Sequence, residues 1–216
     1  MRITEFVHLK KLTGKRDGID EAVKEVRTAI AQVVWPPKGK KFIINDDVNK
    51  NKNKKTRSGK QGVVLNGVKP IKNRFTEQLS AFPGWQFEDG MPSGEDNKRT
   101  TVFDARKTLR GLGIFGLEWE TGNISSSHRS LNRIVLSCLR GEGCGGILIL
   151  PDRDLYRLLT DRVGNFDELK MYFPVWETHK INMELIVVAV GYDGTSTKVP
   201  YIPRGEDGNA FRARGK

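Results

Sequence analysis

Residues 145–151 read GGILILP, a continuous apolar run of the kind that forms a strand buried on both faces of a sheet. A second such run, MELIVVAVG, occupies residues 183–191, and two short helices are predicted between them at 153–159 and 165–172. Buried apolar strands that alternate with helices indicate an α/β fold, in which helices cover the sheet.

The rest of the chain extends this pattern toward the N-terminus. Periodicity and breaker residues predict helices at 20–34, 72–82 and 125–139, and strands at 101–105 and 114–120. No internal repeat and no convincing boundary interrupts the 216 residues, so we expect one domain over residues 1–216.

The chain is strongly basic, with 37 Lys and Arg against 26 Asp and Glu, a formal net charge of +11. Such an excess favours a polyanionic partner, because cationic side chains that neutralise phosphates release condensed counterions. The alternative is a charge that only keeps the protein soluble. Residues 46–62, DDVNKNKNKKTRSGKQG, are predicted as a solvated lysine-rich loop, which also suits loose contact with a DNA backbone.

Several classes of protein are disfavoured. Cys138 and Cys144 form no disulfide framework and no metal-binding spacing, and we interpret them as free thiols in a reducing cytoplasm. The first residues lack the apolar core of a signal peptide, and no apolar run is long enough to span a bilayer, so we expect no membrane partner. There is no P-loop.

The candidate catalytic acids lie in residues 100–123, TTVFDARKTLRGLGIFGLEWETGN. Side chains alternate along a strand, so Glu118 and Glu120 are predicted to face the same way, with Trp119 opposite. Asp104 can lie beside them if its strand pairs with theirs through the intervening turn. Three converging carboxylates would form a site for a hard cation such as Mg²⁺, which can activate water for attack on a phosphoryl group. The alternative is a solvent-facing edge with scattered acids.

Two segments carry a resemblance to a known family. Residues 117–132, LEWETGNISSSHRSLN, and residues 160–173, TDRVGNFDELKMYF, closely resemble the BamHI family of type II restriction endonucleases. Weaker similarities follow in the same order, at VVWPPKGKKFIIN, VKPIK, GWQFE and VPYIPRGEDG. The departures are a longer lysine-rich loop, a shorter connection between Asp104 and Glu118, a different N-terminus and a truncated C-terminus.

The resemblance implies a fold and a catalytic site. The fold would be a central mixed β-sheet flanked by helices, the restriction-endonuclease-like core. Asp104 and Glu118 would bind Mg²⁺, for which Mn²⁺ could substitute, and Glu120 would act as general base or second-metal ligand. The carboxylate of Glu88 and the backbone carbonyl of Trp119 would complete the coordination.

The resemblance also implies a set of DNA-binding residues. Asn123 and Ser125 stand at a predicted helix N-terminus, which attracts phosphate, although both residue types also cap helices. Arg129 could bind guanine O6 and N7, and Asp161 and Arg162 supply both acceptor and donor chemistry for bases. A local ion pair is the alternative for the last two. Lys72 corresponds to a further DNA-contacting lysine, for which a generic phosphate contact is the alternative.

The implied function is hydrolysis of double-stranded DNA at GGATCC, cut after the first G. A homodimer would match the palindrome, and the helix at 125–139 would pack part of its apolar stripe against the partner chain. A cognate DNA methyltransferase would be expected in the host. The rival functions are a repair or structure-specific nuclease, a DNA-binding protein that does not cut, and an RNA-binding protein, which only the charge supports.

Overall fold

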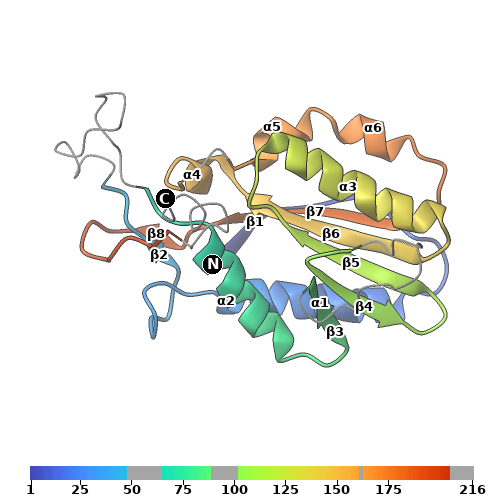
Figure 1. Ribbon diagram of the computed structural model, residues 1–216, viewed down its shortest axis with the longest axis horizontal. Coiled ribbons are helices and arrows are strands. Elements are labelled where there is room, and N and C mark those ends of the chain that lie inside the picture. The colour runs from blue at the N-terminus through green and yellow to red at the C-terminus, as the bar shows by residue number, and fades with distance from the viewer. Residues whose placement is uncertain (48–64, 89–101, 161–162, 205–216) are drawn as a thin grey trace, which may run out of the picture.

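The computed structural model describes residues 1–47, 65–88, 102–160 and 163–204 (Figure 1). Most of the lysine-rich segment and the pair Asp161–Arg162 therefore lie outside the described residues. The centre of the fold is a six-stranded sheet. Its strands, in spatial order, are β1 (Arg2–Lys10), β7 (Glu184–Gly191), β6 (Gly143–Pro151), β5 (Gly113–Trp119), β4 (Ala105–Leu109) and β3 (Trp85–Phe87).

The sheet is mixed, as the resemblance implies. The three middle strands β5, β6 and β7 are parallel to one another. At one edge β1 pairs antiparallel with β7, and at the other β4 pairs antiparallel with β5 and β3 with β4. The parallel strands are buried on both faces, which explains why β6 and β7 appear in the sequence as unbroken apolar runs. The predicted α/β class is confirmed.

Helices cover both faces of the sheet (Figure 1). On one face lie α1 (Asp17–Gln32) and α2 (Lys69–Ser80), and on the other lie α3 (Ile124–Leu139), α5 (Phe166–Lys170) and α6 (Phe173–Glu177). The short helix α4 (Arg153–Tyr156) follows β6, and β2 (Ile43–Ile44) pairs in parallel with β8 (Gly194–Thr195) in a separate two-stranded sheet.

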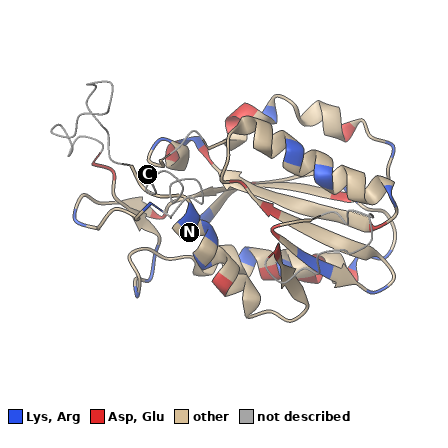
Figure 2. Cartoon of the chain, in the orientation of Figure 1, with Lys and Arg blue, Asp and Glu red and all other residues tan. Residues whose placement is uncertain are grey.

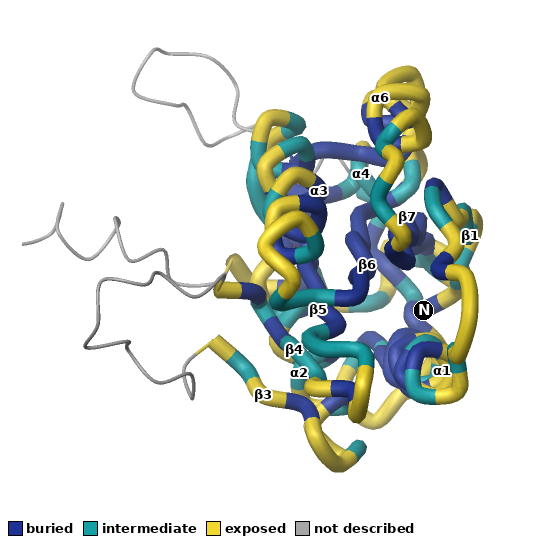
Figure 3. The backbone as a smooth tube through the Cα atoms, turned by 90° about the vertical axis from the view of Figure 1, so that its right-hand side faces the viewer, coloured by how far each residue is buried: buried dark blue, intermediate teal, exposed yellow. Residues whose placement is uncertain are grey.

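The alternation of side chains along β6 divides the interior into two cores. Ile147 and Ile149 pack into the cluster that contains the apolar faces of α1 and α2. Leu148 and Leu150 pack into the cluster that contains α3, α5 and α6. Figure 3 shows β6 buried between these two layers, with the outer sides of the helices exposed. Each helix is therefore held by burial of one apolar stripe against the sheet.

Strands β4 and β1 differ from the sequence prediction. The strand expected at 101–105 is β4, which spans Ala105–Leu109, so that Asp104 precedes the strand instead of lying within it. The strand β1 was not predicted, because it is an edge strand whose residues are mostly half-buried or exposed and are largely polar. Edge strands often carry charged side chains, which discourage pairing with other chains.

Candidate functional site

The candidate site lies where β4 begins and β5 ends. Ala105 pairs with Leu117 in the antiparallel register, which places the next residues outward, Asp104 and Glu118, beside each other. The backbone N–H of Trp119 donates a hydrogen bond to Asp104 Oδ2 at 2.8 Å. The same strand pairing brings β3 alongside, where the backbone N–H of Glu88 donates to the Asp104 carbonyl at 3.3 Å. The sequence is folded here so that two acids from adjacent strands meet.

Glu118 and Glu120 both face α3, as the alternation of the strand predicts. Arg133 on α3 donates from Nη1 to Glu118 Oε1 at 2.5 Å, and Ser127 on α3 donates from Oγ to Glu120 Oε2 at 2.7 Å. The Trp119 side chain points to the opposite core, where its ring lies 4.6 Å from that of Phe75 on α2.

The carboxylates do not all converge. Asp104 and Glu118 are neighbours, whereas Glu120 turns toward α3 and accepts a second hydrogen bond from the Gly122 N–H at 2.6 Å. The Glu88 side chain is exposed on the β3 side. Among the described residues, no group of three or more His, Cys, Asp or Glu side chains is arranged to hold a metal ion. The structure thus pairs Asp104 with Glu118 and places Glu120 nearby, hydrogen-bonded to Ser127 and Gly122, and the convergence of the three carboxylates on a metal ion stays a prediction.

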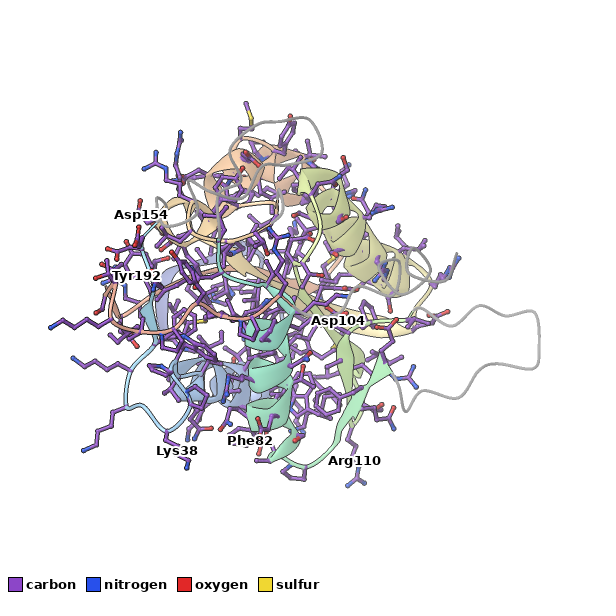
Figure 4. The ribbon with its side chains drawn as sticks, turned by 60° about the vertical axis from the view of Figure 1, so that its left-hand side comes forward. Lys38, Phe82, Asp104, Arg110, Asp154 and Tyr192 are labelled. Carbon is purple, nitrogen blue, oxygen red and sulfur yellow. The ribbon has the colours of Figure 1, made fainter. Side chains whose placement is uncertain are left out.

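Two cations neutralise the acid pair, one from each layer of helices. Lys72 on α2 donates from Nζ to Asp104 Oδ1 at 2.6 Å, and Arg133 on α3 contacts Glu118. In Figure 4 Asp104 is labelled between α2 and α3, and Figure 2 shows basic bands along α3. Lys72, predicted as a DNA contact, is thus engaged with an acid of the site. Arg133 was not predicted, because only the folded structure brings α3 over β5.

Burial sets the protonation of the acids. Burial, followed by the charge of Asp104, raises the pKa of Glu118 from 4.5 to about 8, although Arg133 and Lys72 oppose the shift. Burial also raises the pKa of Glu120, against the stabilising hydrogen bonds from Ser127 and Gly122. Both shifts follow from the cost of placing a charged carboxylate in a region of low polarisability.

The raised pKa of Glu118 predicts that the metal-free protein loses stability as pH rises from about 4.5 to about 8. In that window the folded state still binds a proton that the unfolded state has released, so deprotonation favours unfolding. The contribution of this one group over the whole window is on the order of 5 kcal/mol. The measurement is urea unfolding in EDTA across this pH range, for the wild type and Glu118→Gln. The difference in free energy of unfolding should grow with pH in favour of Glu118→Gln; a constant difference would contradict the assignment.

The acid pair fits a hard divalent cation in its chemistry. Both donors are carboxylate oxygens, the ligand type that Mg²⁺ and Mn²⁺ take in proteins. Glu118 is buried beside another acid, an arrangement that is costly unless a cation offsets the charge. Asp104 and Glu118 are therefore the residues that could hold such an ion, and Glu88 and the Trp119 backbone lie next to them in the strand pairing.

The predicted base-reading residues lie at the start of α3. Asn123 is the N-cap of this helix, and its side chain accepts a hydrogen bond from the Ser126 N–H at 3.3 Å. Ser125 and Arg129 are both exposed, and the Arg129 guanidinium donates to Ser126 Oγ at 2.8 Å. Asn123 thus has the capping role that was the alternative to base contact.

The chain next to Asp161 and Arg162 is anchored to the same place. The N–H of Gly164 donates to the carbonyl of Gly122 at 2.8 Å, immediately before α3 begins. A Cβ at position 164 would lie 2.5 Å from Ser127 Oγ, so the close approach requires glycine. The segment two residues beyond Arg162 is therefore fixed against the N-terminus of α3.

The apolar stripe of α3 packs against the core of its own chain. Leu131, Ile134 and Val135 are buried under the helix, and the expected contact of this helix with a partner chain stays a prediction. Other apolar side chains are exposed on α3, on α6 and between α5 and α6. They are Leu136, Leu139, Met171, Tyr172 and Val175, and Leu139 and Val175 are 62% and 58% exposed.

No helix among the described residues is long and apolar enough to cross a membrane.

Comparison with known proteins identifies the family of the chain. Residues 1–209 match the family model described as Restriction endonuclease BamHI. The chain is 41% identical over 200 residues to the type II restriction enzyme OkrAI of Oceanobacter kriegii, covering 92% of this chain and 94% of that protein. It is 34% identical over 215 residues to the type II restriction enzyme BamHI of Bacillus amyloliquefaciens, covering 97% of this chain and 92% of that enzyme. The chain therefore belongs to the BamHI family of type II restriction endonucleases.

Proposed function

We propose that this protein cuts double-stranded DNA at GGATCC, after the first G, in a reaction that depends on Mg²⁺. The observation that carries the proposal is the acid pair of the half-buried Asp104, just before β4, and the buried Glu118 on the adjacent strand β5. The pair is connected through β5 to the N-terminus of α3, where the candidate base-reading residues begin. The catalytic acid Glu118 and the first candidate recognition residue, Asn123, thus lie in one short stretch of chain.

Each acid has a role that its surroundings support. Asp104 and Glu118 hold the cation, which, when bound, lowers the pKa of water and stabilises negative charge on the phosphoryl group. Glu120 is the candidate for taking the proton of the attacking water. Its raised pKa suits a general base, and Ser127 and Gly122 fix the orientation of its carboxylate. The three acids are close enough in space for their titrations to be coupled.

Recognition is assigned to the helix start and the segment anchored beside it. Arg129 is exposed one turn inside α3, with a guanidinium suited to guanine O6 and N7. Asn123 and Ser125 precede it, and Asp161 and Arg162 are assigned through the resemblance of residues 160–173 to the family. Lys72 would contact DNA after leaving Asp104. The resemblance of residues 117–132 and 160–173 to the family supports this assignment.

A homodimer matches the two-fold symmetry of the palindrome. The exposed apolar side chains on α3, on α6 and between α5 and α6 are the candidate interface, because exposed apolar surface often marks a contact with another chain. A cognate DNA methyltransferase would protect the same sequence in the host, and both enzymes would act in the cytoplasm.

The dimer is tested with Leu139→Asp. In a monomer this exposed position tolerates the change, whereas in the dimer it would bury an unpaired charge, which is strongly unfavourable. We expect the variant to be monomeric by light scattering, with an unchanged melting temperature at low protein concentration and little double-strand cleavage. Ala31→Asp, on the exposed side of α1, is the control and should behave as the wild type. A dimeric Leu139→Asp protein would place the interface elsewhere.

The function is tested by incubating the purified protein with a sequenced plasmid, in Mg²⁺ or in EDTA, and mapping the ends of the products. The proposal predicts fragments that end at GGATCC after the first G, and none in EDTA. Ends at another sequence would refute the specificity. Dispersed ends without a palindrome would favour a repair or structure-specific nuclease, and a plasmid that is bound but uncut would favour a DNA-binding protein.

A further inference from the structure

Two basic side chains contact the acid pair. Arg133 reaches Glu118 from α3, and Lys72 reaches Asp104 from α2, on the opposite face of the sheet. Each acid has one cation at hydrogen-bonding distance, 2.5 Å for the first pair and 2.6 Å for the second. Lys72 and Arg133 together bring two positive charges to the acid pair, the same charge that a divalent cation would bring.

The acids are fixed and the cations can move. The Glu118 side chain is 5% exposed and belongs to a central strand, whereas the Arg133 side chain is 40% exposed on a surface helix. The Asp104 carboxylate is also held by the Trp119 N–H, while Lys72 contacts it through the end of a long flexible chain. Removal of either cation from its acid requires only rotation of the basic side chain toward solvent.

An ion bound between the acids would compete with these cations. A guanidinium at 2.5 Å from Glu118 uses an oxygen that would have to bind the ion, and it repels a second positive charge placed nearby. The ion pair therefore lowers the affinity for metal, while it stabilises the buried acid when metal is absent.

We propose that Arg133 is a positioning residue that holds Glu118 in the metal-free enzyme and must leave this carboxylate when the divalent cation binds. Lys72 does the same at Asp104. The inference rests on the proposed role of Asp104 and Glu118 as metal ligands. DNA binding then affects metal binding, because the phosphates of bound DNA are anions that compete with Glu118 for the Arg133 guanidinium. DNA and metal therefore strengthen each other's binding, as reciprocal linkage requires.

The test is calorimetric titration of Ca²⁺ into the protein alone and into its complex with a GGATCC duplex that lacks a cleavable linkage. The titrations are performed at several pH values above the wild-type pKa of Glu118, because Arg133 lowers this pKa and its removal raises it. Three variants are compared with the wild type. Arg133→Gln removes the charge, Arg133→Lys retains it, and Arg140→Gln removes a charge from an exposed position at the C-terminal end of the same helix.

We expect Arg133→Gln to bind Ca²⁺ about tenfold more tightly than the wild type in the absence of DNA, because a repelling and competing charge is gone. Its melting temperature in EDTA should fall, and saturating Ca²⁺ should raise it more than in the wild type. The enhancement of Ca²⁺ binding by DNA should shrink. Arg133→Lys and Arg140→Gln should both resemble the wild type in these measurements.

The outcomes separate this inference from the function on which it rests. If the wild type binds Ca²⁺, Asp104→Ala does not, and Arg133→Gln binds it as weakly as the wild type or more weakly, the inference is wrong and the metal site stands. A purely structural role for Arg133 gives that result. If neither the wild type nor its DNA complex binds Ca²⁺ or Mn²⁺, the proposed metal-dependent function fails, and the inference fails with it.

Discussion

Glu118→Gln is expected to lower the rate of DNA cleavage by at least about 10³-fold, because a metal ligand is lost and with it several kcal/mol of transition-state stabilisation. The substitution keeps the size of the side chain and one oxygen that can accept the hydrogen bond from Arg133. It also removes a buried carboxylate whose pKa is raised to about 8, so the folded protein should not be destabilised at neutral pH. The loss of activity should therefore be chemical and not a consequence of unfolding.

The measurement is single-turnover cleavage of a duplex with one GGATCC site, together with a gel-shift assay in Ca²⁺ or EDTA. Binding in EDTA should change little, because the substitution leaves the exposed residues of α3 intact. Glu21→Gln, at an exposed position on α1, is the matched control and should cleave at the wild-type rate. A Glu118→Gln protein that cleaves within tenfold of the wild type would contradict the assignment of this acid.

Glu184→Ala is expected to lower the free energy of unfolding by about 3–5 kcal/mol, the range found when one member of a buried charged network is removed. Glu184 is fully buried at the start of β7. Its Oε1 lies 2.6 Å from His8 Nδ1, and its Oε2 accepts from the Leu12 N–H at 2.9 Å and from the Arg16 guanidinium. The carboxylate thus ties β1 and the segment before α1 to the central strand.

Urea unfolding at neutral pH measures this effect. Glu184→Gln retains an oxygen acceptor and should lose less stability than Glu184→Ala, since the Leu12 N–H keeps a partner. Glu5→Ala, an exposed acid on β1, should change the free energy of unfolding by less than about 0.5 kcal/mol. If Glu184→Ala were as stable as Glu5→Ala, the network would contribute nothing to the attachment of β1.

The parts of the fold that could be predicted from sequence are those where burial leaves a local pattern. Strands β6 and β7 are buried on both faces, so all their residues except Glu184 are apolar or glycine, and α3 carries an apolar stripe at helical spacing. Strand β1 escaped prediction because its position at the sheet edge permits polar residues on both sides. Its place beside β7 depends on contacts with residues more than 170 positions away in the chain.

The same distinction holds in the site. Alternation along a strand predicts that Glu118 and Glu120 share a face, and turn length permits Asp104 to pair with Glu118. No local pattern predicts that Arg133 lies over Glu118, because their contact depends on how α3 crosses β5. Nor does the sequence show that Glu120 accepts hydrogen bonds from Ser127 and Gly122 instead of joining the acid pair. These contacts require the packed structure.

The central claim is that Asp104 and Glu118 hold the divalent cation. It is tested most directly by a crystal structure of the protein soaked in Mn²⁺, with the ion located by its anomalous scattering. We predict a peak within coordination distance of an oxygen of Asp104 and an oxygen of Glu118, with the Arg133 guanidinium displaced from Glu118. A peak elsewhere, or an acid pair still bound to Arg133 and Lys72 at saturating Mn²⁺, would contradict the account.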